Sequence, residues 1–123
     1  MTKLIGLTAV LLGMLVGPVI AAPRSFHPYR ANTIAEDSIV LGEDLAAKND
    51  FDSAIIQFRK AREQATTDCE AGFAMAGERA AIAAKSKVQE MGKMHPHVGQ
   101  AAFTEFRHVY EQEQQNLQNS CFV

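Results

Sequence analysis

A short stretch between two predicted helices holds the side chains with the clearest capacity for chemistry. Met91, Met94, His95 and His97 lie close together in the sequence MGKMHPHVG. Thioether sulfur and imidazole nitrogen are ligands that suit copper. The same residues also suit a polar turn, because histidine at a helix C-terminus interacts favourably with the helix dipole. We favour the turn, and we predict neither a metal nor a cofactor.

Cys69 and Cys121 are the only two cysteines of the chain. Cys69 lies 28 residues before His97 and Cys121 lies 24 residues after it. Two helices joined by a short turn at His97 run antiparallel, so their far ends differ by only about one helical turn. We therefore predict a disulfide, with two free buried thiols as the alternative. An oxidising compartment would favour the bond.

No arrangement typical of catalysis is present in the sequence. There is no H-E-x-x-H, no G-x-S-x-G and no glycine-rich phosphate loop. The glutamates are spread along predicted helix surfaces, as Glu63, Glu78 and Glu90 illustrate. We expect a protein that is not an enzyme.

The first 21 residues have the layout of a secretory signal peptide. A short basic start is followed by an uncharged apolar run from Leu4 to Val16 and by a Gly-Pro pair. Val19 and Ala21 stand at the small-residue positions of a cleavage site, so we predict cleavage after Ala21. The apolar run is shorter than a membrane-spanning helix requires. The sequence thus predicts export to the periplasm or full secretion, without stable membrane insertion after cleavage.

The composition of residues 22–123 argues against several partners. Removal of Lys3 leaves 11 basic residues (12 − 1) against 14 acidic ones, and the two signs are interspersed. A protein that binds nucleic acid or an anionic membrane surface usually carries a basic patch. We therefore expect neither partner. Residues 22–32 contain two prolines and predict an extended N-terminal arm.

Helical signals dominate the first half of the remaining chain. Thr33 and Glu36 have the spacing of a capping box, so the first helix is predicted to begin at Thr33. Ile34, Leu41 and Leu45 recur at helical period and predict its buried face. Asp50 is the predicted N-cap of a second helix, residues 51–64, whose apolar residues are Phe51, Ala54, Ile55, Phe58 and Ala61.

Two further helices follow. A second capping box, Thr67 with Glu70, opens an alanine-rich helix that extends to about Lys93. The last helix, residues 100–119, has a seam at Phe103, Phe106, Tyr110 and Leu117 that Glu113 interrupts. The sequence predicts an all-α domain over residues 33–123, with four helices in two antiparallel hairpins.

The first predicted hairpin, about residues 34–67, resembles one tetratricopeptide repeat. The matching residues are Leu41-Gly42 in the first helix and Ala54, Phe58 and Ala61 in the second. The resemblance implies that Gly42 and Ala54 let the helices touch while Phe58 fills the space between them. Several positions depart from the family pattern, namely Ser38, Leu45, Asn49 and Thr66. No second copy follows at the family's spacing.

The resemblance also implies a function in protein or peptide binding. In that family the first helix of a repeat lines a ligand groove, and the corresponding residues here are Glu36, Ile39, Glu43 and Ala46. We expect Ile39→Asp with Glu43→Lys to abolish binding of the unidentified partner while leaving the helices intact. One alternative is a structural or self-associating protein that uses the seam of the last helix. A metal-binding protein that uses His95 and His97 ranks third.

Overall fold

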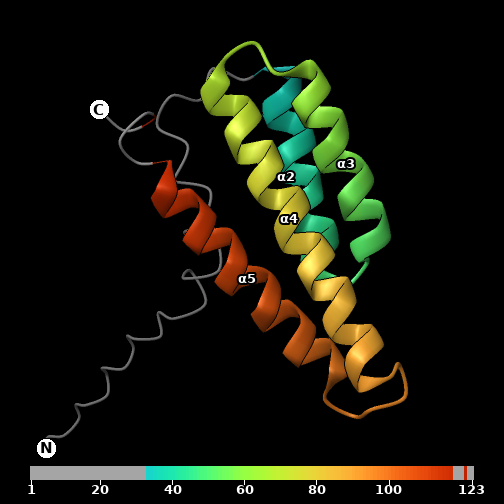
Figure 1. Ribbon diagram of the computed structural model, residues 1–123. Coiled ribbons are helices and arrows are strands. Elements are labelled where there is room, and N and C mark those ends of the chain that lie inside the picture. The colour runs from blue at the N-terminus through green and yellow to red at the C-terminus, as the bar shows by residue number, and fades with distance from the viewer. Residues whose placement is uncertain (1–32, 118–120, 122–123) are drawn as a thin grey trace, which may run out of the picture.

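The computed structural model describes residues 33–117 and 121, and this part of the chain is all-α as predicted. Four helices follow one another: α2 (Ile34–Ala47), α3 (Phe51–Gln64), α4 (Asp68–Met91) and α5 (Val98–Asn116) (Figure 1). None of the described helices is long and apolar enough to cross a membrane. The predicted signal peptide, its cleavage site and the N-terminal arm fall outside the described residues.

Contacts between the helices fix their directions. Ser38 of α2 bonds Gln64 at the end of α3, and Arg59 of α3 pairs with Glu78 of α4. Arg79 of α4 pairs with Glu113 of α5. A second contact gives the direction of the later pairs: Asp52, earlier in α3 than Arg59, meets Lys85, later in α4 than Glu78. Cys69, earlier in α4 than Arg79, is bonded to Cys121, which follows Glu113. Each consecutive pair of helices is therefore antiparallel. The two predicted hairpins are confirmed, and α3 and α4 also pack against each other.

The helix starts follow the predicted capping chemistry. The side chains of Thr33, Asp50 and Thr67 each accept a hydrogen bond from the backbone N–H three residues later. Each bond satisfies a donor that the first helical turn leaves without an intrahelical partner. At the other end, α4 stops at Gly92, whose φ of 93° is in the region that favours glycine.

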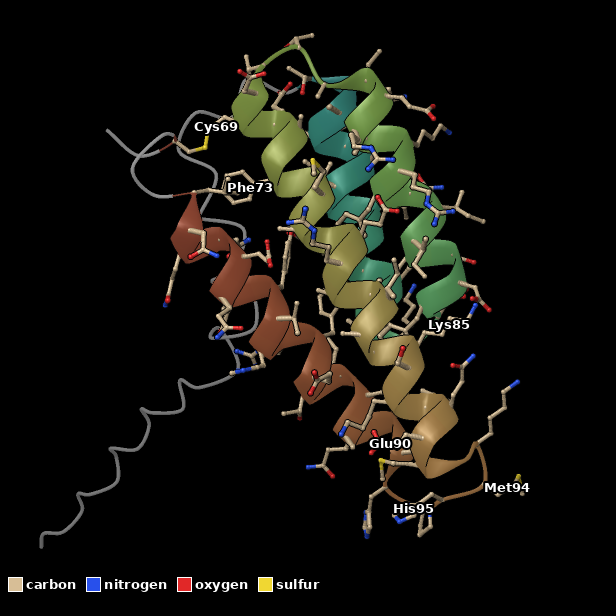
Figure 2. The ribbon with its side chains drawn as sticks, viewed as in Figure 1. Cys69, Phe73, Lys85, Glu90, Met94 and His95 are labelled. Atoms are coloured by element: carbon tan, nitrogen blue, oxygen red, sulfur yellow. A yellow bond between two sulfur atoms is a disulfide. The ribbon has the colours of Figure 1, made fainter. Side chains whose placement is uncertain are left out.

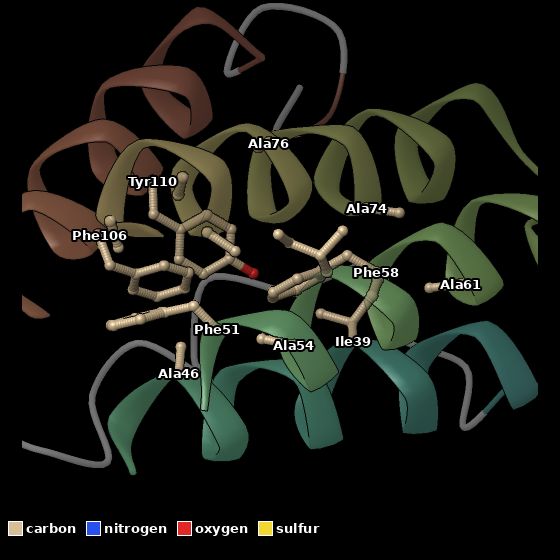
Figure 3. Packing of buried hydrophobic residues seen from close by; sticks show 14 of the residues in the cluster. Ile39, Ala46, Phe51, Ala54, Phe58, Ala61, Ala74, Ala76, Phe106 and Tyr110 are labelled. Carbon is tan, nitrogen blue, oxygen red and sulfur yellow. The ribbon is translucent and has the colours of Figure 1, made fainter. Parts of the chain in front are cut away.

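The core is centred on Phe58, whose ring lies between α2 and α4 (Figure 3). A Cβ atom at Gly42 would lie 2.9 Å from this ring, and one at Gly77 would overlap it. Two aromatic residues of α5 extend the cluster, with Phe106 and Tyr110 ring centroids 6.3 and 5.9 Å from that of Phe58. Two glycines therefore make room for one large ring where three helices meet.

The buried face predicted for α2 is wrong at Ile34 and Leu41, and only Leu45 of the three predicted residues packs against the core. Ile34 and Leu41 are 69% and 45% exposed, whereas Ala35, Ile39 and Ala46 are fully buried. The helix packs against α3 and is also contacted by α4 and α5. Its buried side carries Ala35, Ile39 and Ala46, and Ile34 and Leu41 lie away from that side.

Cys69 and Cys121 form the predicted disulfide, with their Cα atoms 5.6 Å apart. Cys69 lies in the first turn of α4, and Cys121 lies beyond the end of α5. The bond joins the far end of the α4–α5 hairpin, opposite the turn that connects the two helices. Glu113, the charged residue that interrupts the apolar seam of α5, forms an ion pair with Arg79 of α4 at 2.9 Å.

Candidate functional site

The residues predicted to line a groove lie in the interior of the protein. Glu36, Ile39 and Ala46 are buried, and Glu43 is partly buried. The hydroxyl of Tyr110 on α5 donates a 2.6 Å hydrogen bond to the carboxylate of Glu43. The face of α2 that the resemblance assigns to a ligand is thus contacted by the last helix of the same chain.

This burial changes what the proposed double substitution would do. Ile39 is one of the largest fully buried side chains. Ile39→Asp would place a carboxylate in the core, which is strongly unfavourable unless the charge is paired. We therefore expect this variant to be destabilised, in place of the intact helices that the sequence suggested. It would test stability rather than binding.

Asn49, which follows the C-terminal end of α2, forms a second contact with α5. This residue has a φ of 65°, a conformation that asparagine tolerates better than most residues, and it stands where the repeat family commonly has glycine. Its side-chain amide donates a 2.8 Å hydrogen bond to the carbonyl of Gly99, in the first turn of α5. The turn between α2 and α3 is thereby linked to the start of α5.

The seam of the last helix offers little surface for self-association. Phe106 and Tyr110 are buried, and Phe103 and Leu117 pack against the core while partly exposed. The structure therefore uses this seam mainly inside the monomer. An exposed interaction surface has to be sought on another face.

Such a surface lies along α3 and α4, where two isoleucines face outward. Ile56 is 60% exposed and Ile82 is 43% exposed. Ion pairs join the two helices on either side of them, Asp52–Lys85 at one end and Arg59–Glu78 at the other. Because α3 and α4 are antiparallel, both isoleucines fall between these two pairs. We call these six residues the α3–α4 surface.

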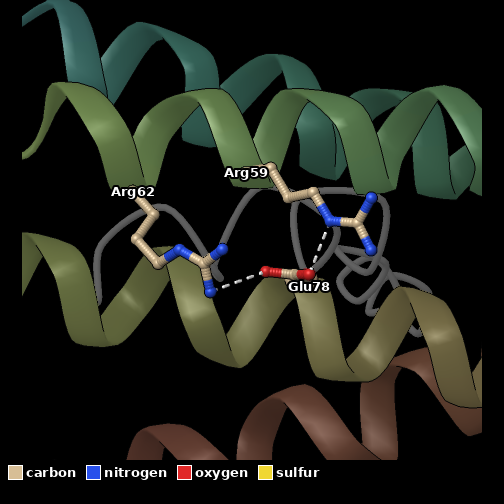
Figure 4. A network of polar contacts seen from close by, with 3 residues as sticks. All are labelled: Arg59, Arg62 and Glu78. Carbon is tan, nitrogen blue, oxygen red and sulfur yellow. Dashed lines mark hydrogen bonds and ion pairs between the residues drawn. The ribbon is translucent and has the colours of Figure 1, made fainter.

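At one end of the α3–α4 surface, Arg62 joins Arg59 and Glu78 in a charge cluster (Figure 4). Arg59 Nε lies 2.7 Å from Glu78 Oε2, and Arg62 Nη1 lies 3.2 Å from Glu78 Oε1. One carboxylate thus orders two guanidinium groups, and the cluster keeps a net positive charge. Each guanidinium is partly exposed and has further N–H donors besides the one that contacts Glu78.

The other end of the surface borders a shallow pocket of about 280 Å³. Lys85 Nζ lies 2.7 Å from Asp52 Oδ1, and this hydrogen bond and charge lower the pKa of the Asp52 carboxyl. This volume is near the lower end of the range of about 300–1,000 Å³ that is usual for small-molecule pockets, and it has room for one inserted side chain. Its lining comes from the start of α3 and the second half of α4: Asn49, Asp50, Phe51, Asp52, Lys85, Val88, Gln89 and Lys93.

Sequence reasoning missed the α3–α4 surface for an identifiable reason. It assigned Arg59, Lys60 and Arg62 to a solvated face and did not consider Ile56, which stands on that same face. An isoleucine among exposed charges is the signal that was present. The partners on α4 could not be known, because Glu78 and Lys85 belong to a different helix.

The predicted turn at His95 and His97 is confirmed, and both side chains are exposed. Among residues 33–117 and 121, no group of three or more His, Cys, Asp or Glu side chains could hold a metal ion. Comparison with protein-family models, curated proteins and solved structures gives no match. The function must therefore be argued from this chain's own geometry.

Proposed function

We propose that this protein is an exported binding module that docks a protein partner through the α3–α4 surface. The observation that carries the proposal is the exposure of Ile56 and Ile82 between two interhelical ion pairs. Single exposed aliphatic residues are ordinary on protein surfaces. Two that are framed by charges reproduce the apolar centre and polar rim of a protein interface.

The chemistry of the surface indicates the kind of partner. Arg59, Arg62 and Lys85 outnumber Glu78 and Asp52, so a partner segment with acidic residues around an apolar anchor is complementary. Arginine is also enriched at the centres of interfaces. The adjoining pocket is large enough for one anchoring side chain. The tetratricopeptide-like spacing of α2 and α3 supports the same functional class, although the groove itself is occupied by α5.

Export is the second part of the proposal. The disulfide between Cys69 and Cys121 is compatible with an oxidising compartment outside the cytosol. Residues 1–21, which resemble a secretory signal peptide, would direct the chain out of the cytosol. Intact-mass analysis of the exported protein should give a chain that begins at Ala22 and lacks the two thiol hydrogens. A mass that includes Met1 would contradict the export signal.

Photo-cross-linking in the native compartment tests the docking surface. Ser86 is exposed one turn after Ile82, so a photoreactive amino acid at this position would report a partner on the α3–α4 surface. We expect one defined adduct with a different protein. The double substitution Ile56→Ser with Ile82→Ser should abolish it, because it removes the apolar centre.

The matched control is Ile34→Ser with Leu41→Ser, which removes two exposed aliphatic residues from α2. This control should leave the adduct at Ser86 intact. Equal loss in both double variants would contradict a localised site. An adduct of twice the chain mass would replace the proposed partner with a second copy of the chain, and an absence of adduct would refute docking at this face.

A further inference from the structure

The turn between α4 and α5, which carries Met94 and His95, lies at the opposite end of the hairpin from Cys69 (Figure 2). Met94 is 94% exposed, and His95 and His97 are also exposed. A methionine this exposed has no packing role. The turn itself is ordered by hydrogen bonds from His95 N–H to the Gly92 carbonyl and from Val98 N–H to the His95 carbonyl.

The two imidazoles are already close enough to share one ion. Their ring centroids are 5.9 Å apart. Imidazole nitrogen binds a metal at about 2.0 Å, which places two rings on one ion about 5–6 Å apart between centroids. His95 Nδ1 accepts a 3.1 Å hydrogen bond from the His97 backbone N–H, so this lone pair of His95 points at the His97 backbone and not at its ring. A metal at this nitrogen would replace that hydrogen bond.

The donor set selects the class of metal. Structural zinc sites need four nitrogen, sulfur or oxygen ligands, and no third His, Cys, Asp or Glu within the described chain joins the two histidines. The other soft donors in the same stretch of sequence are thioethers, from Met94 in the turn and from Met91 in the last turn of α4. Thioether and imidazole together suit monovalent copper, which is soft.

We propose that this turn binds one Cu(I) ion through His95, His97 and the Met94 thioether, with Met91 as a fourth donor. The site is separate from the α3–α4 surface and does not depend on partner binding. Binding involves coordination only, with no change in the oxidation state of protein or metal. Since the ligands are exposed, the ion is accessible for transfer to or from another molecule.

Competition for Cu(I) against a chromophoric chelator tests the site. The experiment uses the exported protein under anaerobic conditions, with ascorbate as reductant and with mass analysis to verify that the disulfide stays intact. Without free thiols, thiolate binding cannot account for copper retention. We expect one Cu(I) per chain and shifts of the His95 and His97 ring signals in NMR spectra. We expect no retention of Zn²⁺ under matched competition.

Variants separate this site from other donors. His95→Ala with His97→Ala should lose the bound Cu(I), and Met94→Leu, which keeps the shape but removes the sulfur donor, should compete less well with the chelator. His108→Ala is the matched control, because His108 is an exposed histidine in α5. It should bind like the unaltered protein. Retention of Cu(I) by the double variant, or no retention by the unaltered protein, would overturn the proposal.

Discussion

Phe58 and the two glycines around it show how single residues set the distance between helices. The ring lies between Gly42 of α2 and Gly77 of α4, and no Cβ fits at Gly77 without overlap. Glycine within a helix costs about 1 kcal/mol relative to alanine. Close packing offsets this cost, because it lets an aromatic ring bridge three helices.

Gly77→Ala is therefore expected to destabilise the protein although alanine favours helix. Overpacking a dense core costs about 1–3 kcal/mol, and Phe58 is fully buried and has no free space to move into. We expect the free energy of unfolding, measured by urea denaturation, to fall by about 1–3 kcal/mol. Circular dichroism should still show a helical protein.

Gly72→Ala is the matched control on the same helix. Its Cβ would lie 2.9 Å from Leu117 Cδ2, the flexible end of a partly exposed side chain that can rotate away. The helix-propensity gain is the same in both variants, so their difference reports the packing at Phe58. If Gly77→Ala were as stable as Gly72→Ala, this account of the core would be refuted.

At the scale of elements, the starts of α2 and α4 are tied together by Glu70. Its carboxylate accepts hydrogen bonds from the Thr33 hydroxyl at 2.7 Å and from the Thr66 backbone N–H at 2.9 Å. Thr33 is also the N-cap of α2, so one residue caps its own helix and contacts a neighbouring one. Two local capping motifs thereby become one tertiary contact. The sequence showed both motifs but not their connection.

The pH dependence of stability should report this contact. Burial by itself raises the pKa of the Glu70 carboxyl, but hydrogen bonds from the Thr66 backbone and from the Thr33 and Thr66 hydroxyls outweigh it and lower the pKa. A lowered folded-state pKa means that the stabilisation is present above the unfolded value of about 4.5 and is lost as the pH falls through the folded-state pKa. The free energy of unfolding should therefore decline as the pH falls below about 4.5 and towards the folded-state pKa of Glu70.

The variant Glu70→Gln tests whether stability falls at acid pH because Glu70 becomes protonated. At pH 7 the variant should be less stable by about 1.5–3 kcal/mol, the range for hydrogen bonds to a charged group. At a pH below the folded-state pKa the gap should narrow, because the unaltered carboxyl is then protonated. Denaturation series at several pH values measure the gap. Glu90→Gln, at an exposed position of the same helix, should show no such dependence. A pH-independent gap for Glu70→Gln would count against the hydrogen-bonded carboxylate.

At the scale of the whole molecule, α5 is held mainly by α4 and by the disulfide. Tyr110 also bonds Glu43 of α2, and the Gly99 carbonyl accepts a hydrogen bond from Asn49 in the turn between α2 and α3. The disulfide joins residues 52 positions apart and fastens the hairpin at the end opposite its turn. Stability of the fold should therefore depend strongly on this one covalent link.

Replacing both cysteines, Cys69→Ser with Cys121→Ser, should lower the free energy of unfolding by about 4 kcal/mol, from the lost restriction of the unfolded chain. Urea denaturation of the two proteins measures the difference. A reductant should destabilise the unaltered protein and leave the variant unchanged. An unaltered midpoint in the variant would show that the link contributes no stability.

The sequence by itself determined the features that depend on a few neighbouring residues. The N-caps at Thr33, Asp50 and Thr67 follow from side-chain and backbone chemistry within one helical turn. The pairing of Cys69 with Cys121 followed from their similar distances along the chain from the turn at His97, 28 and 24 residues.

Only the tertiary structure decided which side of α2 is buried and which residues meet across α3 and α4. Ile39 is buried and Ile34 exposed because α3, α4 and α5 contact one side of that helix, and periodicity within α2 cannot specify its neighbours. The α3–α4 surface likewise depends on the register between two helices, which places Glu78 opposite Arg59 and Lys85 opposite Asp52. Register is set by how side chains of both helices fit together, so it lies beyond what either segment alone encodes.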